Sequence, residues 1–271
     1  MDKTQTTTSP YNEVFFSQLE EGSLRSARET LPIVLECFPC QSVVDVGCGV
    51  GAWLRVCKEL GVRDVLGLDG DYVNPSRLQI APDEFQAADL ADPAPIGRQF
   101  DLALSLEVAE HLPAASSDRF VDFLTAIAPV VLFSAAVPQQ GGTSHVNEQW
   151  PEYWIRKFER RGFVTVDYVR GRIWTNRNVD WWYAQNMLLF VRSKELEANP
   201  TLRTFAIRTE INRLSLIHPG LLAECRMAIA GLEEKLQKNE SKLLPENMHF
   251  LDTLRMLPAI FAGAVRRRLR R

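Results

Sequence analysis

Residues 43–54 read Val-Val-Asp-Val-Gly-Cys-Gly-Val-Gly-Ala-Trp-Leu, and this stretch decides the fold. A short β-branched run ends in an acid, Asp45, and a helix is predicted directly after the glycines, from Ala52 to Leu60. Glycine lets the backbone turn tightly and lets a ligand approach the main-chain N–H groups, so the turn predicts a nucleotide-like cofactor site. The glycines stand at alternate positions: Gly47, Gly49 and Gly51.

Two classes of cofactor fit this turn. Residues 47–52 match the dinucleotide pattern G-x-G-x-x-[GA], which is typical of an NAD-type domain. Asp69 suits either class, because a carboxylate at the end of a second strand holds ribose hydroxyls in both. Asp45 would repel a pyrophosphate and favour the ammonium group of a methionine moiety. Asp89 stands at a third strand end, where it would accept a hydrogen bond from an adenine amino group, so the three acids favour S-adenosylmethionine over NAD.

A longer ordered set carries a family resemblance. Asp45 and its glycines are followed by Asp69, by Asp89 and then by Phe100–Leu112, which contains Glu-Val-Ala-Glu-His-Leu. Over roughly residues 25 to 192 this order resembles the class I S-adenosylmethionine-dependent methyltransferases, most of all the bacterial small-molecule and glycan type. The resemblance implies S-adenosylmethionine as cofactor and S-adenosylhomocysteine as product. The expected cofactor-binding residues are Asp45, Gly47, Cys48, Gly49, Asp69, Gly70, Asp89, Leu90, Glu107 and His111.

The pattern of elements agrees with this resemblance. Two last strands, at 163–170 and 184–191, are separated by a loop of about 13 residues without a clear helix, which favours antiparallel pairing. We therefore predict a Rossmann-like α/β fold: a mostly parallel seven-stranded sheet with an antiparallel last strand, helices on both faces and a helical C-terminal extension. The earlier strands are predicted at 42–46, 64–68, 84–87, 100–105 and 129–135.

Three parts are predicted along the chain. Residues 1–40 are an N-terminal segment whose two helices, 11–20 and 23–38, close over the cofactor. Residues 41–193 form the cofactor-binding core. Residues 194–271 form a helical extension, with helices expected at 221–238 and 248–257.

The charge of the chain is uneven. The last six residues carry five arginines, so the other 265 of the 271 residues have a net charge of −8. An acidic body argues against a nucleic-acid enzyme, which needs a basic working surface. The basic tail beside an apolar face suits either an anionic membrane surface or docking on its own domain or a partner subunit, and docking is favoured.

Composition indicates a cytoplasmic location. No run of 18 or more apolar residues occurs, and the polar residues 1–8 are not a secretion signal. The five cysteines are scattered. Cys37 and Cys40 form a CxxC, but no second pair or nearby histidine completes a zinc site, so we interpret the cysteines as unpaired thiols.

Methyl transfer to a hydroxyl needs a proton acceptor, and histidine suits this role near neutral pH. His145 is the best candidate for the catalytic base, because it lies in a polar loop after the fifth strand, at the edge where α/β sheets bind ligands. Its alternatives are bracing of the loop or substrate binding without proton transfer, and Asn147 is a candidate cap of a helix at 151–161. Glu107, Glu110, His111 and His145 include metal-ligand types, but they match no recognised compact set, and we predict no metal ion.

Aromatic side chains give a hint about the substrate. Five of the six tryptophans lie between positions 150 and 182, with arginines nearby. Flat aromatic faces bind sugar rings or other rings, and arginine pairs with carboxylate or phosphate. Plain packing is the alternative, above all for Trp150 and Trp154, which share a helix face. The predicted substrate contacts are Trp150, Trp174, Arg172, Trp181 and Trp182.

Together these patterns predict methyl transfer from S-adenosylmethionine to an oxygen of a polar cyclic small molecule, a sugar or a natural-product intermediate. Transfer to a nitrogen of a small-molecule amine is the next interpretation, because a neutral amine attacks without prior deprotonation. A catalytically silent cofactor-binding module whose C-terminal helices recruit a partner is a third. An NAD-dependent dehydrogenase is the last.

Overall fold

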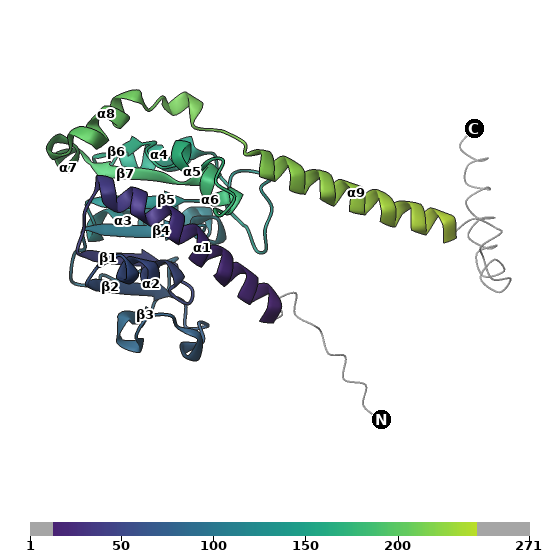
Figure 1. Cartoon of the computed structure of the whole chain (residues 1–271), viewed down its shortest axis with the longest axis horizontal. Coiled ribbons are helices and arrows are strands. Elements are labelled where there is room, and N and C mark those ends of the chain that lie inside the picture. Colours follow the sequence, from purple (N-terminus) through teal and green to yellow (C-terminus); the bar gives the residue numbers. More distant parts are fainter. Residues whose placement is uncertain (1–12, 243–271) are drawn as a thin grey trace. The chain divides into compact units, whose positions relative to one another are not determined.

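The computed structural model describes residues 13–242 and shows a seven-stranded sheet covered by helices (Figure 1). The strand order is β3-β2-β1-β4-β5-β7-β6. Neighbouring strands are parallel except at β7, which is antiparallel to both β5 and β6. The predicted fold is therefore confirmed. The strands are β1 Ser42–Val46, β2 Asp64–Asp69, β3 Phe85–Ala87, β4 Leu102–Leu106, β5 Val130–Ser134, β6 Phe163–Val166 and β7 Leu188–Arg192.

The first helix differs from the prediction. One continuous helix, α1, replaces the two expected before the first strand, and Gly22 lies inside it. A Cβ at Gly22 would lie 2.4 Å from Asp180 Oδ2, so this glycine allows a close approach and does not break the helix. The α-helices are α1 Glu13–Cys37, α2 Ala52–Glu59, α3 Ser117–Ile127, α4 Pro151–Glu159, α5 Arg170–Ile173, α6 Trp181–Asn186, α7 Ser193–Ala198, α8 Pro200–Arg208 and α9 Pro219–Lys242.

The core has two halves because successive residues of a strand point to opposite faces of the sheet. On β1, Val43 packs with the apolar residues of α1, α2 and α6, whereas Val44 packs with those of α3 and α4. The same division occurs on β5, where Leu132 and Phe133 belong to different halves. Continuous apolar runs therefore identify the central strands, since both faces are covered.

The connection between β6 and β7 is more structured than predicted. It contains the short helices α5 and α6, so the expected strands at 163–170 and 184–191 are too long on this side. Arg170 holds the connection together: it is 1% exposed, pairs with Asp167 at 2.6 Å and donates to the carbonyl oxygens of Gln185 and Leu214. A fully buried guanidinium with these partners is part of the core.

The chain divides into a compact unit up to Leu221 and a second unit from Leu222 onward. Helix α8 belongs to the first unit, because Asn199 donates to the Cys37 carbonyl at 2.7 Å and Leu202 is fully buried. The amphipathic helix expected at 221–238 lies within α9, whereas the one expected at 248–257 lies outside the described residues.

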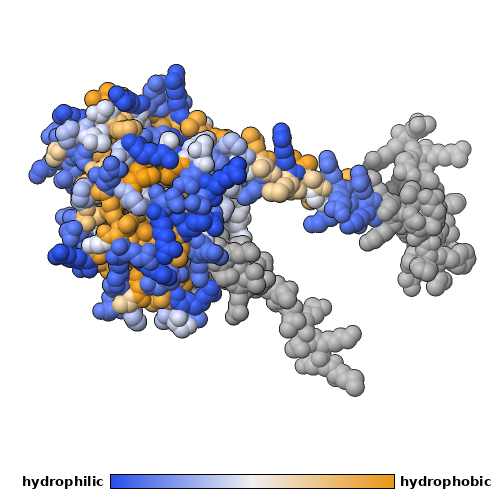
Figure 2. Space-filling view, in the orientation of Figure 1, coloured by the Kyte–Doolittle hydropathy of each residue, from blue (hydrophilic) through white to orange (hydrophobic). Residues whose placement is uncertain are grey.

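Several large apolar side chains of α9 are exposed, and orange and blue side chains both occur along this helix in Figure 2. None of the helices in the described range is long and apolar enough to cross a bilayer. The exposed apolar residues of α9 are Leu222, Met227, Ile229, Leu232 and Leu236.

Candidate functional site

A pocket of about 1010 Å³ opens at the carboxyl ends of the parallel strands. The strand order reverses between β1 and β4, and this switch point is where open α/β sheets bind ligands. Eight of the ten predicted cofactor-binding residues line the pocket. The lining residues are Gly47, Gly49, Asp69, Gly70, Asp71, Tyr72, Ala87, Ala88, Asp89, Leu90, Glu107, Val108, His111, Leu112 and Ser144.

Asp69 connects the glycine turn to the end of β2. Its carboxylate accepts hydrogen bonds from the main-chain N–H groups of Gly49 and Gly70, each at 2.7 Å. The hydroxyl of Tyr72 donates to the same carboxylate. An ionised carboxylate offers about four acceptor positions, so these three bonds nearly fill it. A ligand hydroxyl that binds Asp69 therefore competes with Tyr72.

The glycines of the turn are required for two different reasons. Gly47 has φ +92°, and a Cβ there would lie 2.2 Å from Val108 Cγ2, so the turn packs tightly on the residue after Glu107. Gly49 has φ +52°, and a Cβ there would meet nothing within 4 Å. Because Gly49 lines the pocket, a side chain at this position would occupy space that is open to a ligand.

The other two predicted cofactor contacts, Asp45 and Cys48, do not line the pocket. Both are buried beneath the turn. Burial, and then the charge of Asp69, raises the pKa of Asp45 to about 8. The Cys48 sulfur fills the space over Gly67, where a Cβ would approach it to 2.6 Å, and burial raises the pKa of the thiol. Cys48 is thus a packing residue and not the predicted cofactor contact.

Glu107 is positioned by two amide side chains, one from the loop after β5 and one from the chain before the antiparallel strand β7. The reversed strand brings Asn186, which precedes β7, to the edge where β4 ends. Asn186 Nδ2 donates to both Glu107 carboxylate oxygens at 3.1 and 3.3 Å, and Gln140 Nε2 donates at 2.9 Å. Glu107 has φ +55°, and such strain in a non-glycine residue clusters at functional sites. Burial raises the pKa of Glu107, and these amide donors oppose the shift.

A second group of polar residues adjoins the pocket, and one of its members, His111, lines it. Glu110, His111 and His145 each offer one ligand atom, and these atoms lie within 4.8 Å of one another. The two imidazole rings meet edge to face with centroids 4.8 Å apart. The sequence spacing matched no recognised compact set of metal-ligand types, but three of the four residues meet in the structure. They meet because the loop after β5 bonds to the Glu110 carbonyl through the N–H groups of Val146 and Asn147.

His145 itself does not line the pocket, although Ser144 and His111 do. Its Nδ1 lies 2.9 Å from Glu148 Oε1, which fixes the orientation of the ring. Asn147 does not cap α4, whose N-cap is Trp150, but bonds to Ser117 Oγ at 3.1 Å.

The predicted substrate contacts are spread over the connection before β7 and the start of α4. None of them is among the residues that line the pocket. Trp181 packs against Trp182 with ring centroids 5.5 Å apart, and Trp174 packs against His218 at 4.8 Å. Trp150 is 42% exposed at the start of α4.

Arg172 also has a structural position instead of the predicted ligand contact. Its guanidinium lies 3.7 Å from the ring centroid of Tyr168 and 4.7 Å from that of Phe205. It also donates to the Tyr168 carbonyl. Cation–π contacts of this kind anchor α8 to the connection after β6 and leave Arg172 away from the pocket.

Sequence reasoning missed several residues of the site. Tyr72 follows Asp69 by only three residues, and its ring covers Gly70, where a Cβ would lie 2.1 Å from Tyr72 Cε1. A tyrosine so close in sequence to Asp69 could have been identified as a site residue from the sequence. Gln140 and Asn186 carry no sequence signal, because the approach of Gln140 to Glu107 depends on the turn after β5 and that of Asn186 on the register of β7.

One family model matches more than half of the chain. The sequence model of the family described as "Methyltransferase domain" matches residues 17–188. The chain is 30% identical over 106 residues to ribosomal RNA large subunit methyltransferase E of Caulobacter sp. (strain K31). This aligned segment covers 37% of the chain and 45% of that protein. The chain thus spans under half the length of this curated relative.

A solved structure that aligns along almost its whole length shares this fold. The sugar N-methyltransferase KedS8 from Streptoalloteichus sp ATCC 53650 is 15% identical, with a TM-score of 0.50 over 71% of this chain and 99% of that chain. Magnesium protoporphyrin IX methyltransferase from Synechocystis PCC 6803, solved with bound SAH, is 19% identical, with a TM-score of 0.47 over 68% of this chain and 89% of that chain.

Proposed function

Because the chain belongs to the methyltransferase domain family, we propose that it transfers a methyl group from S-adenosylmethionine to an oxygen of a polar small molecule. The observation that carries the proposal is the contact between Asp69 and the glycine turn. An acid at the end of β2, bonded to Gly49 N–H at 2.7 Å and lining a large pocket, is the arrangement expected for a ribose-binding carboxylate.

The residues present fit this cofactor. Asp69 would hold the ribose hydroxyls, and Asp89 would accept from the adenine amino group. Leu90 supplies an apolar wall. Glu107 places a negative charge near Gly47, where the ammonium group of the methionine part would be stabilised. The open space at Gly49 is the cradle that any side chain would fill.

Bound S-adenosylmethionine supplies an activated methyl group, so the protein mainly aligns the acceptor and receives its proton. His145 is the proposed proton acceptor, because Glu148 holds its Nδ1 and leaves Nε2 for the proton. His111 lines the pocket and contacts the His145 ring, so it lies between the pocket and the base. The pair therefore offers a route for the proton away from the acceptor oxygen.

The polarity of the lining supports a polar acceptor such as a sugar or a natural-product intermediate. His111, Ser144 and Asp71 face the pocket beside the cofactor residues. The tryptophans expected to stack on a substrate ring are not among the residues that line the pocket. The pocket therefore does not support the prediction that the substrate is cyclic.

The thiols support a cytoplasmic enzyme. Cys37 and Cys40 are buried and unpaired, and burial raises the pKa of each to about 12. Unpaired thiols suit a reducing compartment, and we place the protein in the cytoplasm.

The test is a methyl-transfer assay with methyl-labelled S-adenosylmethionine and a panel of sugars, phenols and amines, with products identified by mass spectrometry. We expect label on oxygen. Label on amines alone would replace the oxygen assignment by N-methylation, and no transfer despite cofactor binding would favour the silent module.

Two variants test the assigned roles. Asp69→Ala should weaken cofactor affinity at least tenfold, as expected for loss of hydrogen bonds to a charged group. Asp71→Ala is the matched control, because Asp71 lines the same pocket but makes no bond to the glycine turn. His145→Ala should lower turnover by about 10²-fold and leave cofactor affinity unchanged. Equal affinity in both aspartate variants would contradict the ribose assignment.

A further inference from the structure

Glu110 is a buried acid without a matching partner. It is 0% exposed, and neither carboxylate oxygen has a partner at full hydrogen-bond geometry among the described residues, although the Ala136 main chain and the Glu107 side chain lie near it. Leaving such a group unsatisfied is costly, and an unsatisfied buried group in a native protein calls for an explanation such as a bound ion. The main chain at this position is fixed, because the Glu110 carbonyl accepts from the N–H groups of Val146 and Asn147.

Two imidazoles lie beside this carboxylate, and the Glu107 side chain is also close to it. The ligand atoms of Glu110, His111 and His145 lie within 4.8 Å of one another. Ligands on one divalent transition-metal ion, each about 2.0–2.2 Å from it, lie up to about 4.3 Å apart. An inward movement of about half an ångström to an ångström by these side chains therefore suffices to bring all three to one ion.

The surroundings of His145 have the form of a metal site. A metal-ligating histidine usually donates its second ring nitrogen to a carboxylate or carbonyl, which fixes the ring and its tautomer. Glu148 supplies this carboxylate at 2.9 Å from Nδ1, and so leaves Nε2 for an ion.

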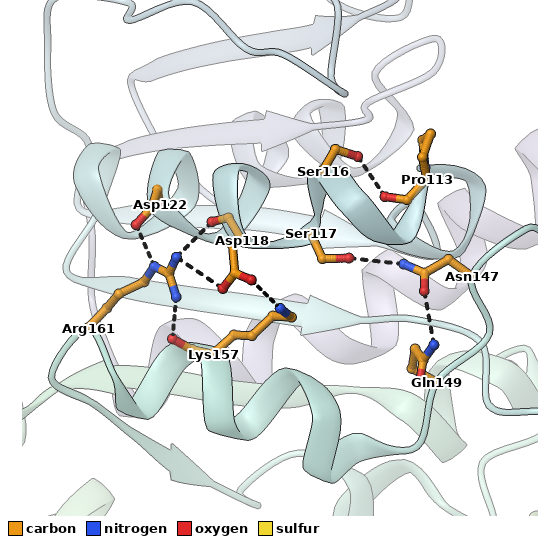
Figure 3. A network of polar contacts seen from close by, with 9 residues as sticks. All are labelled: Pro113, Ser116, Ser117, Asp118, Asp122, Asn147, Gln149, Lys157 and Arg161. Carbon is orange, nitrogen blue, oxygen red and sulfur yellow. Dashed lines mark hydrogen bonds and ion pairs between the residues drawn. The ribbon is translucent and has the colours of Figure 1, made fainter.

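The chain that follows His145 is fastened to α3. In Figure 3, Asn147 bonds to Ser117 at the start of α3 and Gln149 bonds to Asn147, at 3.1 Å each. Nearby, Lys157 and Arg161 of the α4 region pair with acids of α3 at 2.6 Å. These contacts fasten the chain after His145 to α3, and the bonds from the N–H groups of Val146 and Asn147 to the Glu110 carbonyl hold it against the turn after β4.

We propose that Glu110, His111 and His145 bind a divalent first-row transition-metal ion. Two imidazoles and one carboxylate are the ligand set of catalytic zinc sites and of other transition-metal sites, whereas magnesium and calcium prefer oxygen ligands alone. His111 is exposed and lines the pocket, so a bound ion has an open position toward the substrate.

The proposed metal site goes beyond the proposed function. Where that function holds, His145 is a metal ligand instead of the proton acceptor. A cation at the pocket wall lowers the pKa of a hydroxyl that reaches it, and the hydroxyl proton then passes to solvent water. The oxygen lone pair forms the new O–CH₃ bond as the S–CH₃ bond breaks, and the bonding pair stays on sulfur as a thioether.

Metal binding is measured on the purified chain after treatment with a chelator. Co²⁺, Zn²⁺ and Mg²⁺ are titrated separately by calorimetry, and the visible spectrum of the Co²⁺ sample reports nitrogen and oxygen ligands. We expect one Co²⁺ or Zn²⁺ per chain and at least tenfold weaker binding of Mg²⁺. At a hundredfold excess over Kd the unfolding midpoint should rise by about 5 °C or more.

Variants locate the ion. Glu110→Gln and His111→Ala should each weaken Co²⁺ binding at least tenfold, and Glu148→Gln should weaken it about 10- to 100-fold. Glu197→Gln makes the same acid-to-amide change on an exposed side chain of α7 and should leave binding unchanged. Because His111 is exposed, its variant should fold even if Glu110→Gln does not, and thermal unfolding without metal checks this.

Three results would overturn the metal site. The first is no saturable binding of Co²⁺ or Zn²⁺, and the second is binding that His111→Ala leaves intact. Loss of binding in Cys225→Ala would do the same, because Cys225 is an exposed thiol outside the cluster. A parallel titration with S-adenosylhomocysteine in chelator separates the two proposals. Cofactor binding without metal binding removes only the metal site, and metal binding without cofactor binding removes only the methyl-transfer proposal.

Discussion

Replacing Gly47 by alanine places a methyl group where the structure has no room for it. The new Cβ would lie 2.2 Å from Cγ2 and 2.8 Å from Cγ1 of Val108, which is buried and lines the pocket. Gly61 is a matched control: its φ of +94° is close to the +92° of Gly47, but a Cβ there would meet nothing within 4 Å. The two variants therefore share the backbone strain and differ in the clash.

The magnitude follows from these two terms. A left-handed φ destabilises the folded state of an alanine variant by about 1–2 kcal/mol. Alanine also lowers the conformational entropy of the unfolded chain relative to glycine, which offsets about 0.4–1 kcal/mol of this loss. Gly61→Ala should thus lower the free energy of unfolding by about 1 kcal/mol. Gly47→Ala adds overpacking of about 1–3 kcal/mol. At about 2–4 °C per kcal/mol for a domain of this size, the unfolding midpoint of Gly47→Ala should lie about 2–12 °C below that of Gly61→Ala.

Urea unfolding and calorimetry with S-adenosylhomocysteine measure both consequences. The clash pushes Val108 toward the pocket, so Gly47→Ala should also lose cofactor affinity, whereas Gly61→Ala should not. The double variant Gly47→Ala/Val108→Ala removes the obstructing methyl groups and should recover part of that affinity. Equal stability and equal affinity of the two glycine variants would refute the packing argument.

Three further predictions follow from single contacts. Tyr72→Phe removes the hydroxyl that competes for Asp69, so cofactor affinity should rise severalfold in calorimetry; a loss of affinity would show that the hydroxyl helps binding. The pKa of Asp45 is about 8 in the folded protein, against 3.8 for an unperturbed carboxyl group, so between these pH values the folded state keeps a proton that the unfolded state has lost. The free energy of unfolding therefore falls as pH rises from about 4 to 8. Asn at this position does not titrate, so Asp45→Asn should increase the free energy of unfolding at pH 8 and not at pH 4. The gain corresponds to about 1.4 kcal/mol for each unit by which folding shifts the pKa of Asp45. A gain that does not depend on pH would contradict this prediction. Arg170→Met strips the partner from Asp167 and two buried carbonyls and should cost about 3–5 kcal/mol in urea unfolding; a cost below about 1 kcal/mol would contradict a core role.

The strands and the glycine turn could be predicted because their causes are local. An apolar run such as Leu102–Leu106 indicates a strand covered on both faces, and alternate glycines after a strand indicate a tight turn beside a ligand. Asp69 and Asp89 follow from the same logic, because the carboxyl ends of parallel strands meet at one edge. These residues line the pocket as expected.

The rest depends on tertiary contacts that no local pattern records. Asn186 reaches Glu107 only through the reversal and register of β7. His145 follows Glu110 by 35 residues, and spacing alone could not show that their side chains meet. Arg172 shows the opposite error, since aromatic and cationic side chains that pack on one another have the same composition as a binding surface.

Calorimetric titration of the purified chain with S-adenosylmethionine, S-adenosylhomocysteine and NADH tests the central claim most directly. The structure predicts saturable binding of both adenosyl compounds, weakened at least tenfold by Asp69→Ala, and no binding of NADH. Binding of NADH in place of the adenosyl compounds, or no binding of any of the three, would contradict the assignment of this pocket.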